Sequence, residues 1–104
     1  MIVHTARSEW DDGVRRLAAT QGDPRRYREL SSLVDAVVDE LRRRVGQTYT
    51  LDELAQAYAG AEDWVREIVV RETEPRSRAG LADTALVQDA AFGRYAHGAS
   101  NYRP

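Results

Sequence analysis

Apolar residues recur at three- and four-residue steps along most of the chain, which is the spacing of amphipathic α-helices. β-branched residues are few and do not alternate with polar ones, so the pattern predicts no strand. The predicted helices cover approximately residues 5–20, 24–45, 50–60, 61–73 and 81–96. We therefore expect an all-α fold, a compact bundle of about five helices that forms a single domain over residues 1–104.

The longest predicted helix, 24–45, has the clearest boundaries. Gly22 can end the preceding helix, Asp23 can cap the new one, and Pro24 suits its first position. Gly46 is placed to adopt the left-handed conformation that often follows a helix end. Because this helix carries a long valine-rich stripe, we predict that it is the spine of the bundle.

The spacing of apolar residues in 50–72 predicts two short helices joined by a tight turn, with their apolar faces directed at each other. Thr50 and Glu53 have the spacing of a capping box, and Gly60 falls in the turn. The small Ala55 and the β-branched Val65 stand where helix-turn-helix domains place a small crossing residue and a residue that locks the second helix. The stretch therefore resembles a helix-turn-helix, and the alternative interpretation is an ordinary helical corner.

The charge of this stretch does not favour DNA binding. Its second helix opens with Ala61, Glu62 and Asp63, whose acidic side chains stabilise a helix N-terminus but repel phosphate. Such a helix suits a basic protein surface better than a duplex. If nucleic acid were bound, the contacts would come from arginines, namely Arg42, Arg43, Arg44, Arg66 and Arg71.

Composition supports the same preference. All 15 basic residues are arginine, against 17 acidic residues, so the net charge is −2 and the isoelectric point is about 5.7. A mildly acidic chain is an unpromising electrostatic nucleic-acid binder. The absence of lysine together with abundant alanine is typical of a genome rich in G and C.

Several chemistries are excluded or disfavoured. The chain has no cysteine, which removes disulfides and thiolate metal sites. Its two histidines, His4 and His97, lie near opposite ends, and no phosphate-binding loop or nucleophile motif occurs. We predict no enzyme activity, no metal and no cofactor. Without a membrane-spanning run or an N-terminal hydrophobic signal, a cytoplasmic location is expected.

The C-terminal segment combines Tyr95 and Tyr102 with Arg94 and Arg103, residue types that are enriched at protein interfaces. The alternative is that Phe92 and Tyr95 close the core and that residues 99–104 form a flexible tail. This segment, together with the central helix pair, resembles small helical proteins of unassigned function in actinobacteria, a resemblance that implies no activity.

The leading prediction is a small non-enzymatic protein-interaction or regulatory module whose partner is another protein. One alternative is a helix-turn-helix transcription regulator, and a second is a structural homo-oligomer formed through the valine-rich face of residues 24–45. The residues predicted to contact the protein partner are Glu62, Asp63, Arg66, Arg94, Tyr95, Tyr102 and Arg103.

Overall fold

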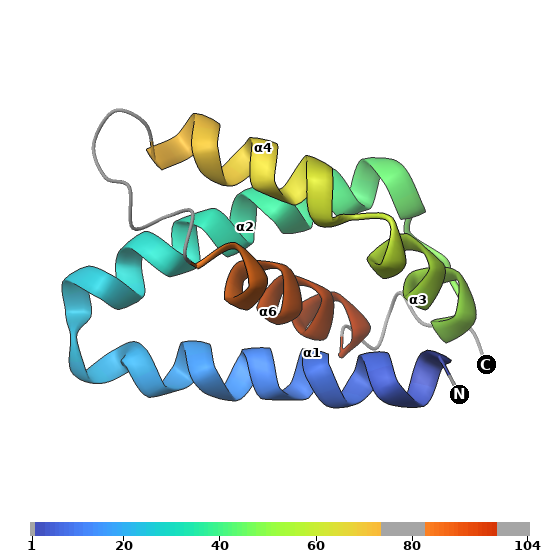
Figure 1. Cartoon of the computed structure of the whole chain (residues 1–104), viewed down its shortest axis with the longest axis horizontal. Helices are drawn as coiled ribbons and strands as arrows, with labels where there is room; N and C mark the ends of the chain where they lie inside the picture. The colour runs from blue at the N-terminus through green and yellow to red at the C-terminus, as the bar shows by residue number, and fades with distance from the viewer. Residues whose placement is uncertain (1, 74–82, 98–104) are drawn as a thin grey trace.

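The computed structural model describes residues 2–73 and 83–97, and within these ranges the chain is entirely helical apart from its connections. The elements are α1 (Ile2–Ala19), the 3-10 helix η1 (Thr20–Gly22), α2 (Pro24–Val45), α3 (Leu51–Ala59), α4 (Glu62–Thr73) and α6 (Thr84–Ala96). Five α-helices pack into one bundle (Figure 1), which confirms the predicted fold class.

The element at the centre of the bundle is α6, and the prediction that residues 24–45 form the spine is corrected accordingly. In Figure 1 α6 lies between α1 on one side and α2 with α4 on the other, and it packs on α1, α2, α3 and α4. Its side chains are buried around most of its circumference, among them Val87, Ala91 and Phe92. A helix covered on several sides shows no strong one-sided pattern, which is why the sequence did not indicate its position.

Two glycines allow α1 and α6 to cross closely. A Cβ atom on Gly13 would lie 2.4 Å from the Cβ of Asp89 and 2.6 Å from the backbone nitrogen of Ala90. On the other helix, a Cβ on Gly93 would lie 2.7 Å from the backbone oxygen of Trp10. The two helices are therefore in close contact, which brings the polar residues one turn before each glycine to the same level of the bundle.

The boundaries of α2 and α3 follow their capping residues. The Asp23 side chain accepts a hydrogen bond from the backbone N–H of Arg26 at 3.3 Å, and Gly46 ends α2 with a φ of 89°. Thr50 and Glu53 form both hydrogen bonds of the predicted capping box. By contrast, α1 begins at Ile2, earlier than its predicted start.

The two helices predicted over residues 50–72 are α3 and α4, which form a corner whose apolar faces meet α6. Leu54 and Ala55 of α3 are buried where that helix packs on α1 and α6, whereas Val65 and Val69 of α4 are buried where that helix packs on α6 and α2. The expectation that the two faces point at each other is wrong, because the central helix provides the apolar surface that both of them cover.

The connection between α2 and α3 is fastened to the C-terminal end of α6. The Tyr49 hydroxyl donates a hydrogen bond to the backbone carbonyl of Tyr95, and the Tyr95 hydroxyl donates to the carbonyl of Gly46 at 2.5 Å. The two rings stack with their centroids 5.0 Å apart. Two segments far apart in the sequence, the connection after α2 and the end of α6, are thus joined at one end of the bundle.

Within the described ranges, no helix combines the length and apolar character required to cross a membrane. The predicted flexible tail, 99–104, and its two predicted contact residues, Tyr102 and Arg103, lie outside the described residues.

Candidate functional site

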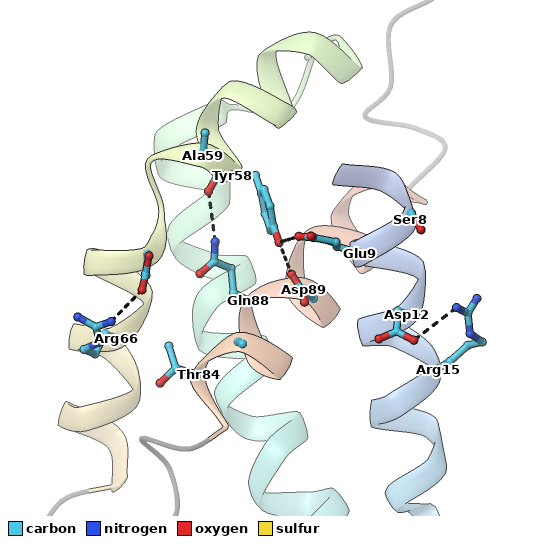
Figure 2. Close-up of a pocket in the computed structure, with 12 residues that line it drawn as sticks. Ser8, Glu9, Asp12, Arg15, Tyr58, Ala59, Arg66, Thr84, Gln88 and Asp89 are labelled. Atoms are coloured by element: carbon cyan, nitrogen blue, oxygen red, sulfur yellow. Dashed lines mark hydrogen bonds and ion pairs between the residues drawn. The ribbon is translucent and has the colours of Figure 1, made fainter. Parts of the chain in front are cut away.

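A groove with a volume of about 920 Å³ opens between α1, the α3–α4 turn and the N-terminal half of α6. Figure 2 shows side chains from all of these elements around it. The lining residues are Ser8, Glu9, Asp12, Arg15, Tyr58, Ala59, Glu62, Arg66, Thr84, Ala85, Gln88 and Asp89. Four of them carry a carboxyl group and two carry a guanidinium group, so the lining is acidic on balance.

The polar feature that joins the elements of the groove is a cluster of two carboxyl groups around one phenol. The Tyr58 Oη atom lies 2.5 Å from Oε2 of Glu9 and 2.5 Å from Oδ1 of Asp89, as Figure 2 shows. These three residues come from α1, α3 and α6, and the crossing at Gly13 sets the distance between α1 and α6. The cluster therefore links three helices at the floor of the groove.

The surroundings of the cluster shift two of its pKa values. Burial raises the pKa of the Asp89 carboxyl above its ordinary value; the Tyr58 hydrogen bond opposes that rise, and the negative charge of Glu9 adds to it. Burial also raises the pKa of the Tyr58 phenol strongly, and its hydrogen bonds to Asp89 and Glu9 raise it further. The phenol consequently remains protonated in neutral solution.

The wall of the groove is fixed by a second contact between α3 and α6. The Gln88 side chain, which is buried, donates a hydrogen bond from Nε2 to the backbone carbonyl of Tyr58 at 3.2 Å. The same carbonyl also accepts a hydrogen bond from the backbone N–H of Ala61 at 3.2 Å, so Gln88 provides a second donor at the end of α3. The α3–α4 turn is thereby held against the central helix.

Both arginines of the groove are already paired with acidic neighbours on their own helices. Arg66 Nη2 lies 3.0 Å from Oε1 of Glu62, and Arg15 Nη2 lies 3.5 Å from Oδ1 of Asp12 (Figure 2). Each pair brings opposite charges together, which leaves Glu9 and Asp89 as the carboxyl groups whose charge is not offset by a paired arginine of the lining.

Of the residues predicted to contact a protein partner, those that the structure describes do not all lie on one surface. Glu62 and Arg66 line the groove, whereas Asp63 is outside its lining, with a side chain that is 95% exposed. Arg94 instead pairs with Asp35 of α2, with 2.5 Å between Nη1 and Oδ1. The prediction of an exposed Tyr95 is wrong: the side chain is 3% exposed because it closes the core against Tyr49, as the alternative interpretation held.

The arginines suggested for nucleic-acid contact are held in ion pairs along their helices. Arg42 pairs with Asp39 at 2.9 Å, and Arg43 and Arg44 both reach Glu40, at 2.8 and 2.9 Å. Hydrogen bonding from Arg43 is the main reason why the pKa of Glu40 is lowered.

Arg71 also makes an ion pair with a neighbour, and Arg44 makes a second contact, with an aromatic ring. Arg71 Nε lies 3.6 Å from Oε2 of Glu72, and the guanidinium carbon of Arg44 lies 4.7 Å from the ring centroid of Trp64. A phosphate backbone would have to compete with these partners for each cation.

The valine-rich face of α2 is not available to a second copy of the chain. Val34 and Val37 are completely buried, and Val38 is 6% exposed, because this face packs inside the bundle. These side chains already serve the core, so they offer little exposed surface to the homo-oligomer that was predicted through this face.

Sequence reasoning missed Glu9, Tyr58, Gln88 and Asp89 as a polar site. Tyr58 was expected in the core, where its ring does contact Trp10 and Phe92, but its hydroxyl reaches the groove. One signal was present: Gln88 and Asp89 interrupt the otherwise apolar middle of the last helix. Adjacent polar residues in a buried segment require partners, and those partners lie on other helices.

Among the described residues, no three histidine, aspartate or glutamate side chains are grouped as a metal ion would require. The chain matches no protein-family model, no curated protein and no solved structure at a level that indicates relationship.

Proposed function

We propose that this protein is a small non-enzymatic interaction module that binds a basic segment of another protein in the groove between α1, the α3–α4 turn and α6. The observation that carries the proposal is the acidic balance of the groove, whose two arginines are both paired with carboxylates of the same lining. An acidic concave surface attracts a cationic segment and repels a polyanion such as DNA. The volume of about 920 Å³ accommodates several side chains of an extended segment.

A role in interaction, and not in catalysis, is supported by how the polar groups of the floor are used. The Tyr58 hydroxyl is engaged by Glu9 and Asp89, and the Gln88 amide is engaged by the Tyr58 carbonyl. These groups stabilise the wall of the groove and present negative charge. A cytoplasmic setting is part of the proposal, because a chain without cysteine cannot form the disulfides that mark oxidising compartments.

The test compares binding of a fluorescent arginine–glycine peptide to two single variants of α4 by fluorescence anisotropy. Glu62→Gln removes a carboxylate of the groove and releases Arg66, so we expect the dissociation constant to rise about three- to tenfold, or about 0.7 to 1.4 kcal/mol. Glu67→Gln removes the same charge from the same helix outside the groove, and we expect a change below about twofold.

The two variants have equal net charge, so any difference between their dissociation constants reflects the position of the lost carboxylate. Equal weakening by Glu62→Gln and Glu67→Gln would show that the peptide is attracted only by the overall charge of the protein. Binding that is unaffected by both changes would place the contact surface elsewhere. Either result would contradict the proposed function.

A further inference from the structure

We propose that the groove is sensitive to pH, because Glu9, Tyr58 and Asp89 hold one shared proton whose release, as the pH rises, strengthens binding of the basic segment. This inference rests on the proposed function for its ligand, but the shared proton itself depends only on the geometry of the cluster. Its basis is the number of protons that the three side chains need in order to make the observed contacts.

Both carboxyl oxygens lie 2.5 Å from the same phenolic oxygen. A phenol has one O–H to donate, and an ionised carboxylate has none. If Glu9 and Asp89 were both ionised, one of the two contacts would place an anionic oxygen against a phenolic oxygen with no hydrogen between them. A second proton removes this conflict: one carboxyl group donates to Tyr58, and Tyr58 donates to the other.

The charges around the cluster favour keeping that proton. From α1, Glu9 and Asp12 face Asp89 with negative charge, and Arg16 faces it with positive charge. Burial has the largest influence and raises the pKa of Asp89, which makes this carboxyl the main site of the shared proton.

The charged residues that the other described helices bring near the cluster are held in ion pairs. From α4, Glu62 and Arg66 line the groove as an ion pair. α2 lies on the side of α6 that faces away from α1 (Figure 1). Its ion pairs with the α6 segment join Arg26 to Asp83 at the N-terminal end and Asp35 to Arg94 near the C-terminal end.

Loss of the shared proton changes the groove in two ways. The lining gains one negative charge, and Glu9 then repels Asp89 across the Tyr58 hydroxyl. A guanidinium or ammonium group from the ligand can take the place of the proton as the positive partner. Binding and protonation therefore exclude each other, and the peptide binds more tightly at higher pH. For one proton, the dissociation constant changes by at most about tenfold per pH unit.

The first experiment measures the dissociation constant of the arginine–glycine peptide from pH 4.5 to pH 8 at constant ionic strength. We expect the wild-type protein to bind more tightly as the pH rises through the pKa of the pair and then to reach a plateau. Asp89→Asn keeps a neutral side chain at every pH, so its binding should be weak and should lose most of that dependence. His97→Gln is the control, because His97 lies 2.9 Å from Asp11 on the same pair of helices but outside the groove.

We expect His97→Gln to retain the wild-type pH dependence. A pH dependence that is unchanged in Asp89→Asn, or abolished in His97→Gln, would overturn the inference. Far-UV circular dichroism of each variant across the same pH range verifies that the helices are intact.

The second experiment follows the side-chain carboxyl ¹³C resonances of Glu9 and Asp89 by NMR without any ligand. We expect the two groups to titrate as a coupled pair, with one carboxyl still protonated above the ordinary aspartate range, and we expect Tyr58→Phe to change both curves. Independent titration of both groups at ordinary values would overturn the shared proton even if the peptide binds. Absence of peptide binding at every pH would instead overturn the proposed function and the claim that pH controls binding. The NMR titration would still show whether the cluster holds a shared proton.

Discussion

At the scale of single residues, the position of the groove depends on the absence of a side chain at Gly13. This glycine lets α1 approach the backbone of α6 at Asp89, and Glu9 lies one turn before it on the same helix. The close crossing is therefore what allows a carboxyl group of α1 to reach the Tyr58 hydroxyl. Gly93 has the reciprocal role against the backbone of Trp10.

We expect Gly13→Ala to destabilise the protein by about 1 to 3 kcal/mol, which is the usual cost of forcing extra volume into a packed interior. The added methyl group would meet backbone atoms of Asp89 and Ala90, which cannot move independently of α6. This cost should exceed the gain of about 1 kcal/mol that alanine normally brings to a helix over glycine. Urea denaturation measures the change.

Gly22→Ala is the matched control for that measurement, because a Cβ atom at Gly22 would have nothing within 4 Å. We expect its free energy of unfolding to stay within about 0.5 kcal/mol of the wild type. Stabilisation by Gly13→Ala would mean that the two helices are not in close contact at this position.

At the scale of elements, the connection between α2 and α3 illustrates how a short segment without regular structure is held in place. Tyr49 is completely buried, and its hydroxyl is bonded to the last turns of α6, whereas Tyr95 reaches back to Gly46. The start of α3 is then fixed by the capping box at Thr50. Two tyrosines and one cap thus determine the direction in which α3 leaves α2.

This arrangement predicts a loss of stability in alkaline solution. Burial raises the pKa of Tyr49 to about 12 from an ordinary value of 10.0. Since the pKa in the folded protein is the higher one, the contribution of Tyr49 to stability is complete below pH 10 and declines as the pH rises towards 12. Circular dichroism and tyrosinate absorbance over this pH range measure the change.

Tyr49→Phe should lower the free energy of unfolding at neutral pH by about 1 to 2 kcal/mol, because the Tyr95 carbonyl loses a buried donor. The same variant should show a shallower decline above pH 10. Tyr27→Phe, at the half-exposed start of α2, is the control. If the control variant and Tyr49→Phe behaved alike, the connection would not be fastened as described.

At the scale of the whole molecule, the stability of the bundle depends on α6, which packs on each of the other four helices. Amide hydrogens that exchange only on global unfolding are found in the elements with the most buried surroundings. We expect the amides of the α6 segment to exchange more slowly than those of α4, which has solvent on its outer face. Hydrogen exchange followed by mass spectrometry tests this order, and slower exchange in α4 than in α6 would contradict it.

The sequence was sufficient for those parts of the structure that depend on neighbouring residues. The bounds of α2 follow from Asp23, Pro24 and Gly46, and the start of α3 follows from Thr50 and Glu53. These signals work because a cap and its helix lie within a few residues of each other. The burial of Trp10 and Phe92 could likewise be expected from helical periodicity.

The groove could not be predicted in the same way, because its parts are distant in the sequence. Tyr58 is 49 residues from Glu9 and 31 residues from Asp89, and their meeting depends on which helix occupies the centre. That place belongs to α6, whose apolar residues surround it instead of forming one stripe. Periodicity identifies which face of a helix is buried, but a helix buried on several faces gives no such direction.

The central position of α6 also has a consequence for the order in which the chain becomes structured during synthesis. The first 83 residues include the apolar faces of α1, α2, α3 and α4, but the helix that all of them cover lies at residues 84–96. Until that segment has left the ribosome, these faces can meet only one another or another protein. The growing chain therefore carries exposed apolar surface until residues 84–96 are available, and the last of the described helices converts four separate faces into one core.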